Sequence, residues 1–205
     1  MQIERVHRYI DSRFPSEVLW EHGAFLIDNY RPCMFKIRDY HSATVFFDDY
    51  TNISEIIDEF RFYAEHITVF YDNKDRIIAE YPPVTLKTIP LEEIQPAQFY
   101  VDLDKVKAVS RFIRNSEDVI IPVIYDTDIE RWVSLDGHSR MYYASTQGWQ
   151  TVRAFESKPG AYVPRFVEES RQRGILSPKD IIPLQHDEYE EKWFGFCKTI
   201  FAQEN

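Results

Sequence analysis

Short apolar segments separated by turn residues dominate the first part of the chain. Three of them, each rich in aromatic residues and followed by turn residues, predict strands at residues 24–30, 33–37 and 43–49. Two further segments, at residues 67–71 and 76–81, flank an Asp-Asn-Lys-Asp turn and predict a β-hairpin. This region therefore contributes mostly β-structure.

Two helices are expected around these strands. Four apolar residues fall at helical spacing within residues 53–60, with Asn52 placed as the N-cap and Glu55 three residues later. A shorter amphipathic stripe at residues 3–10 predicts a helix that Pro15 ends.

Pro82-Pro83 interrupts the hydrogen bonding of both helices and sheets, so we place a domain boundary there. Beyond it, the pattern predicts a strand at residues 84–94, a loop at 95–101, a helix from about Asp102 and a strand at 119–125. The last of these is almost continuously apolar, which is typical of a strand buried on both faces.

We therefore expect an α+β protein with three parts. Residues 1–83 form a small α+β unit to which no motif assigns a role, residues 84–156 form a second α+β domain, and residues 157–205 form a helical C-terminal extension packed on that domain. Five residues of the extension fall at helical spacing: Tyr189, Trp193, Phe196, Cys197 and Ile200.

The segment VSLDGHSRMYYASTQGWQTVRAF, residues 133–155, changes character three times. It begins as a strand, breaks at Asp136-Gly137, continues as a helix to Gly148 and ends as a second strand. Polar and basic side chains are thereby placed where a helix begins.

Such a helix start has the features of an anion-binding site. Its first N–H groups lack intrahelical partners and attract anions, and Gly137 permits a sharp turn and a close approach of the ligand. Arg140 offers a forked guanidinium, while His138 and Ser139 add donors. Asp136 would orient one of these side chains or a metal-bound water. The alternative is a simple turn in which Ser139 or Asp136 only caps the helix.

The stretch from Ile89 to Phe155, roughly a third of the chain, resembles the ParB/sulfiredoxin superfamily. The resemblance has four parts in order: IPLEEIQPAQF, DLDKVKAVSRFI, IIPVIY and SLDGHSRMYYASTQGWQTVRAF. It implies a ParB/sulfiredoxin-like domain at residues 84–156. It also implies that a phosphate or a nucleotide (ATP, ADP or CTP) is held by Gly137, His138, Ser139 and Arg140.

The branches of this superfamily are distinguished by residues within the motif. Sulfiredoxins carry a catalytic cysteine in Gly-Gly-Cys-His-Arg, and His138 stands at that position here, which argues against sulfinic acid repair. ParB partition proteins carry Gly-Glu-Arg-Arg and a DNA-binding domain after the fold. Here His138-Ser139 replaces Glu-Arg, and the helical segments after Phe155 show no basic recognition face.

The local sequence is most similar to the DGHHR-type branch, which includes nucleotide-dependent free serine kinases, with Ser139 in place of the second histidine. This similarity implies phosphoryl transfer to a small hydroxyl metabolite, with or without magnesium. Such a reaction needs a carboxylate base. Glu92 and Glu93 lie in the corresponding segment, and Glu93 joins Asp136 and His138 as a candidate catalytic residue.

Two glutamines in the loop offer amides that could read a base or a ribose. The superfamily context favours Gln98 as a nucleotide contact over Gln95. The alternative for each is an exposed loop residue without a binding role.

Charge and composition limit the classes of partner that we expect the chain to bind. The chain has 24 basic and 34 acidic residues, a net charge of −10, and no cluster of basic residues, so DNA is disfavoured as a partner. It has no run of 18 apolar residues and no signal-peptide core, and Cys33 and Cys197 are far apart. We expect a reduced cytoplasmic protein without a membrane partner. Its oligomeric state is left open.

No metal site is predicted. Asp48-Asp49 are paired carboxylates of the kind that hold Mg²⁺, but such a pair before a helix is more often part of a turn. His41, His66 and His186 have no ligand partners at informative spacing and are expected to be structural or surface residues.

Two functions follow from these observations. The first is an enzyme that transfers a phosphoryl group from a nucleotide to a small hydroxyl metabolite, with Arg140 and backbone amides neutralising the developing charge. The second is a non-catalytic adaptor, nucleotide-responsive or associated with nucleic acid and related to partition proteins, in which the same pocket only senses its ligand.

Overall fold

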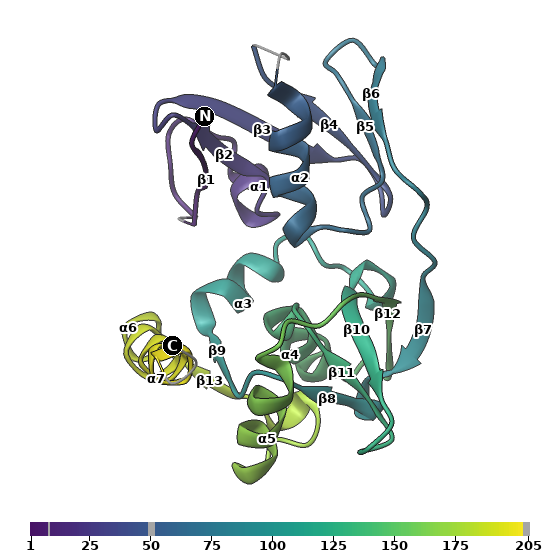
Figure 1. Cartoon of the computed structure of the whole chain (residues 1–205), viewed down its shortest axis with the longest axis vertical. Helices are drawn as coiled ribbons and strands as arrows, with labels where there is room; N and C mark the ends of the chain where they lie inside the picture. Colours follow the sequence, from purple (N-terminus) through teal and green to yellow (C-terminus); the bar gives the residue numbers. More distant parts are fainter. Residues whose placement is uncertain (8, 49–51, 203–205) are drawn as a thin grey trace. The chain divides into compact units, whose positions relative to one another are not determined.

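A computed structural model describes residues 1–7, 9–48 and 52–202 (Figure 1). The chain forms two compact units, Met1–Thr85 and Leu86–Asn205, and the division falls just after Pro82-Pro83. Both units combine helices with a sheet, which confirms the α+β class. Within the described residues, no helix is both long and apolar enough to cross a lipid bilayer.

The first unit is built on a six-stranded sheet whose strands lie in sequence order. The strands are β1 (Ile3–Arg5), β2 (Ala24–Ile27), β3 (Arg31–Ile37), β4 (Ser42–Phe46), β5 (Val69–Tyr71) and β6 (Ile77–Glu80). All neighbours are antiparallel except β4 and β5, which are parallel and are joined through helix α2 (Ile53–Tyr63). The predicted strands, the central helix and the hairpin of this unit are confirmed.

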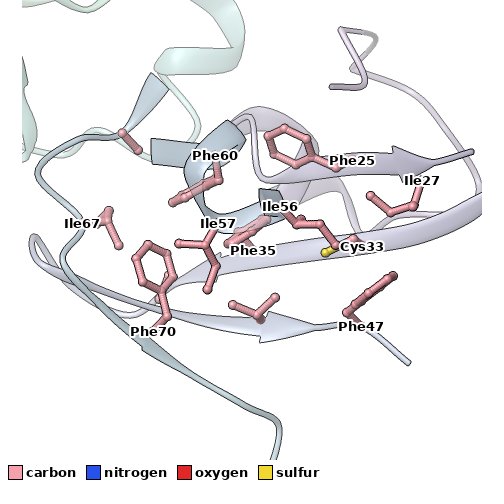
Figure 2. Close-up of a cluster of buried hydrophobic side chains, with 13 residues drawn as sticks. Phe25, Ile27, Cys33, Phe35, Phe47, Ile56, Ile57, Phe60, Ile67 and Phe70 are labelled. Atoms are coloured by element: carbon pink, nitrogen blue, oxygen red, sulfur yellow. The ribbon is translucent and has the colours of Figure 1, made fainter. Parts of the chain in front are cut away.

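Helices cover both faces of this sheet at β2, which explains why all four residues of that strand are buried. Phe25 belongs to the core beneath α2, whereas Leu26 packs with α1 (Ser16–Trp20) in a separate cluster. Figure 2 shows the core beneath α2, where the rings of Phe35 and Phe60 stack with centroids 4.1 Å apart. Burial of these large apolar surfaces is the main stabilising contribution to the unit.

The start of the chain differs from the prediction. Ile3–Arg5 form strand β1, paired with β2, rather than a helix, and Pro15 precedes helix α1 instead of ending one. A helix of one or two turns has little stability in isolation, whereas pairing with β2 satisfies the backbone groups of the edge. Asn52 occupies the N-cap position of α2 without a side-chain capping bond. Asp49, one of the two carboxylates considered for Mg²⁺, lies outside the described residues.

The second unit contains a five-stranded mixed sheet in the order β7-β12-β10-β11-β8, and a separate pair of parallel strands, β9 and β13. The strands are β7 (Lys87–Pro90), β8 (Ile94–Pro96), β9 (Tyr100–Asp102), β10 (Ile120–Asp126), β11 (Arg131–Ser134), β12 (Thr151–Glu156) and β13 (Ile182–Leu184). The apolar segment predicted as a buried strand is β10, at the centre of the sheet.

The helices of this unit form two groups. Around the sheet lie η2 (Leu91–Glu93), α3 (Leu103–Val109), η3 (Ser116–Asp118) and α4 (His138–Thr146). Beyond β12 come α5 (Val163–Gln172), η4 (Pro178–Asp180), α6 (His186–Tyr189), η5 (Glu190–Phe194) and α7 (Gly195–Ala202). This C-terminal segment shares a core with β9 and β11 through Val101, Val133, Phe166 and Trp193, so it belongs to the second unit.

Two parts of the second unit differ from the prediction. The expected strand at residues 84–94 is divided by η2, and the expected loop at 95–101 contains part of β8 and of β9. The C-terminal segment, expected to be helical, also contains β13. Strands β8 and β9 form because they pair with β11 and β13, which are distant in sequence, and the local pattern carries no sign of such partners.

We predict that Phe60→Ala destabilises the protein by about 3–5 kcal/mol, because the ring is 1% exposed and its removal leaves a cavity. Phe62→Ala is the matched control on the same helix, since Phe62 is 79% exposed, and should change stability by less than about 0.5 kcal/mol. Urea unfolding of the full chain followed by circular dichroism measures both. Equal effects of the two substitutions would contradict this account of the core.

Candidate functional site

The turn before α4 requires glycine for two reasons. Gly137 has a φ of +81°, in the left-handed region that L side chains rarely adopt. A Cβ at this position would also lie 2.3 Å from Cγ2 of Ile121, on the central strand β10. The bend therefore brings the backbone at the start of α4 directly against the sheet.

Arg140 holds this turn in place. Its Nη1 donates to the carbonyl oxygen of Ile120 at 2.6 Å, and its Nη2 lies 3.4 Å from a carboxylate oxygen of Asp136. Burial lowers the pKa of Arg140, and the nearby Asp136 carboxylate acts in the opposite direction. The guanidinium expected to receive an anion is thus partly engaged by the protein itself. Through the bond from Nη1 to Ile120, the guanidinium links the first turn of α4 to strand β10.

The N-cap residue of α4 is Gly137, which has no side chain that could cap the helix. The first backbone bond of the helix runs from the N–H of Met141 to the carbonyl of Gly137. The N–H groups of His138, Ser139 and Arg140 therefore precede the intrahelical ladder and have no acceptor within it. The N-cap position itself is occupied by Gly137, and by neither Ser139 nor Asp136.

His138 is a buried, neutral histidine. Its Nε2 lies 3.1 Å from Oγ of Ser134, the last residue of β11, and the side chain is 7% exposed. Burial lowers its pKa to about 4, and the charge of Arg140 contributes in the same direction against the opposing effect of Asp136. At neutral pH the ring is uncharged, so it serves this site as a hydrogen-bonding group rather than as a cation.

The two glutamines are held by other parts of the unit. Gln95 is fully buried, donates to the carbonyl of Ile175 at 2.8 Å and accepts from Nη1 of Arg171 at 3.2 Å, so the expectation that it reads a base or a ribose is wrong. Gln98 donates to the carbonyl of Tyr100 and lies 3.2 Å from the hydroxyl of Tyr189. The described contacts of Gln98 are therefore with Tyr100 and with Tyr189 of the C-terminal segment.

Glu92 and Glu93, the predicted carboxylate bases, have no described contact with the motif. Glu92 and Glu93 are exposed on η2, away from the turn in sequence, and only the backbone carbonyl of Glu92 has a described bond, to Arg131. Asp136 is exposed beside Gly137, and its described hydrogen bond is to Arg140. The motif thus gathers Asp136, Gly137, His138, Ser139 and Arg140 without placing Glu93 or Gln98 among them in any described contact.

The two thiols are poor nucleophiles. Burial raises the pKa of Cys33 to about 12 and that of Cys197 to about 11, so both are protonated at neutral pH. Cys33 belongs to the core of the first unit. This agrees with the expectation that the chain does not use cysteine chemistry of the sulfiredoxin kind.

One polar cluster was missed by the sequence analysis. His186 was expected to have no ligand partners, yet its Nδ1 lies 2.8 Å from a carboxylate oxygen of Asp102, and Asp104 lies in the same group. Leu184 pairs with Asp102 in the register of β13 and β9, which brings residues distant in sequence together. The Asp-Leu-Asp sequence at residues 102–104 was the only feature of the local sequence that indicated this cluster.

Comparison with known proteins assigns no family. No family model matches the chain, and no curated protein matches it. Among solved structures, the chain is similar to protein Atu1540 from Agrobacterium tumefaciens, with 20% sequence identity and a TM-score of 0.33. The match covers 48% of this chain and 53% of that one, so the chain spans about half the length of that protein.

Taken together, the start of α4 presents several hydrogen-bond donors and no thiol nucleophile among the described residues. Backbone amides and the hydroxyl of Ser139 are suited to an oxyanion, and the positive end of the helix dipole favours negative charge there. The arrangement is suited to binding a phosphate or a carboxylate.

We expect Gly137→Ala to destabilise the protein by about 3 kcal/mol, because the new methyl group needs both an unfavourable φ and displacement of Ile121. Gly148→Ala is the control: its φ is +72° and a Cβ there has no neighbour within 4 Å, so only the backbone cost of about 1 kcal/mol applies. Thermal and urea unfolding measure the difference. Equal losses would show that contact with β10 does not constrain the turn.

The depressed pKa of His138 predicts a specific pH dependence. Its pKa is about 4 in the folded chain and about 6.5 when unfolded, so the unfolded state takes up a proton first as pH falls. The contribution is present above about pH 6.5 and is lost as pH falls toward 4. Between pH 7 and pH 5 the wild type should lose roughly 2 kcal/mol more stability than His138→Gln in urea unfolding. Parallel losses would exclude a neutral, buried ring.

Proposed function

We propose that the second unit binds a phosphate group of a nucleotide, ATP, ADP or CTP, at the start of α4. The observation that carries this proposal is a glycine at the N-cap of α4, which has no capping side chain and whose backbone packs closely against Ile121 of β10. An α-helix that begins in this way offers converging N–H donors and a favourable dipole to an anion. The resemblance of residues 89–155 to the ParB/sulfiredoxin superfamily points to the same ligand class.

The geometry supports ligand binding better than phosphoryl transfer. A kinase needs a carboxylate base near the acceptor hydroxyl, and Glu93 is exposed on η2 without a described contact to the motif. Asp136 is the carboxylate adjacent to the turn, but it is also a partner of Arg140. We therefore favour a nucleotide-responsive adaptor. Transfer to a small hydroxyl metabolite, with Asp136 as base and magnesium as companion of the nucleotide, is the catalytic version of the proposal.

Substitution of Ser139 tests the binding site. Ser139→Asp places a carboxylate in the first turn of α4, where it competes with a phosphate for the backbone amides and repels it, so nucleotide affinity should fall about tenfold or more. Ser139→Asn is the control of similar size without charge and should keep its affinity within a few-fold. Thermal shift with ATP, ADP and CTP measures this, because ligand at 100 times its Kd stabilises a protein by about 2.7 kcal/mol.

The outcomes separate the alternatives. A shift in the wild type that is lost in Ser139→Asp and kept in Ser139→Asn supports binding at α4. Equal binding by both variants would place the ligand elsewhere, and no shift with any nucleotide would overturn the proposal. Release of ADP from ATP in the presence of serine and magnesium, abolished in Asp136→Asn, would favour the kinase over the adaptor.

A further inference from the structure

A second group of side chains in this unit has the composition of a metal site. It consists of Asp102 at the end of β9, Asp104 in the first turn of α3 and His186 at the start of α6. One ligand atom from each lies within 4.8 Å of the others. Two carboxylates and an imidazole are a donor set found around divalent transition metals.

Strand pairing fixes this arrangement. Strands β9 and β13 are parallel, with Leu184 opposite Asp102, and His186 follows β13 at the beginning of α6. Oδ1 of Asp102 accepts the N–H of Asp104 at 2.8 Å, which caps α3 and orients the carboxylate. The buried ligand is therefore held by the backbone on both sides. His186 and Asp104 are exposed enough to adjust around an ion.

The charges around the imidazole favour a cation. The Asp102 side chain is 1% exposed, and its carboxylate is paired with Nδ1 of His186 at 2.8 Å. Its described partners are His186 and the N–H of Asp104, and Glu190 approaches the other side of the imidazole. The nearby lysines have other contacts: Lys105 lies over the ring of Tyr189, and Lys192 pairs with Glu188. Three carboxylates thus surround a single imidazole.

The distances fit ligands of one ion. Nδ1 of His186 lies 2.8 Å from Oδ2 of Asp102, and neighbouring ligand atoms around an ion with bonds of about 2.1 Å lie about 3 Å apart in six-coordinate and about 3.4 Å apart in four-coordinate geometry, which the exposed histidine can reach by a small adjustment. Oε1 of Glu190 lies 3.6 Å from Nε2 on the opposite side of the ring. A histidine that binds a metal through one nitrogen usually donates its other N–H to such a group.

We propose that Asp102, Asp104 and His186 form a binding site for a divalent transition metal, with Glu190 orienting the histidine. The imidazole selects ions such as zinc over magnesium and calcium, which prefer oxygen ligands alone. By binding residues of both, the ion links the end of β9 to the start of α6. It thereby stabilises the packing of the C-terminal helices on the rest of the unit. This site is separate from the phosphate site proposed at α4 and does not depend on it.

Calorimetric titration of the full chain with zinc tests the site. We expect one saturable site per chain, with affinity reduced about a hundredfold in His186→Gln and at least tenfold in Asp104→Asn. Asp104 is exposed, so its substitution should leave the fold intact. Magnesium should bind at least about a hundredfold more weakly than zinc.

His41→Gln is the matched control. His41 also has its Nδ1 2.8 Å from a carboxylate oxygen, that of Asp39, but the pair belongs to no three-ligand group among the described residues. Zinc affinity should be unchanged in this variant. Absence of saturable zinc binding in the wild type, or equal binding by wild type and His186→Gln, would overturn the proposal. Ser139→Asp should bind zinc normally, which separates this result from failure of the nucleotide proposal.

Discussion

The close approach of the Gly137 backbone to Ile121 determines where α4 can begin. A side chain at this position would collide with the central strand, and the backbone turn requires a positive φ. Arg140 then ties the first turn of the helix to Ile120, one residue earlier on the same strand. The buried, uncharged His138 lies in the first turn of the helix that this contact between a turn and a strand positions.

This arrangement has a consequence for how an anion would be held. Because one edge of the Arg140 guanidinium supports the turn, less of it is available to a ligand than the sequence pattern suggests. The backbone amides and Ser139 therefore carry more of the expected binding. This favours the proposed binding role over the proposed phosphoryl transfer.

A different set of interactions holds the C-terminal segment against the rest of the second unit. Phe99, Phe166 and Trp193 form edge-to-face aromatic pairs, with ring centroids 5.1 Å apart for Phe99 and Trp193. The parallel pairing of β9 with β13 adds backbone hydrogen bonding and brings His186 to Asp102. Apolar packing and strand pairing place the segment, and the polar cluster lies where the two meet.

Local sequence patterns were sufficient to predict elements whose residues show a regular spacing or a characteristic turn. The structure contains a helix at the stripe of residues 53–60, a strand at the apolar run of 119–125, and a turn at Asp136-Gly137. Each was predictable because helical spacing, continuous apolar sequence and turn residues are local properties of the chain. Tertiary structure alone decided that residues 3–5 join a sheet, that Gln95 is buried against Ile175, and that His186 meets Asp102. Each depends on a partner far away in the chain, and a pattern of neighbouring residues cannot encode the register that brings such partners together.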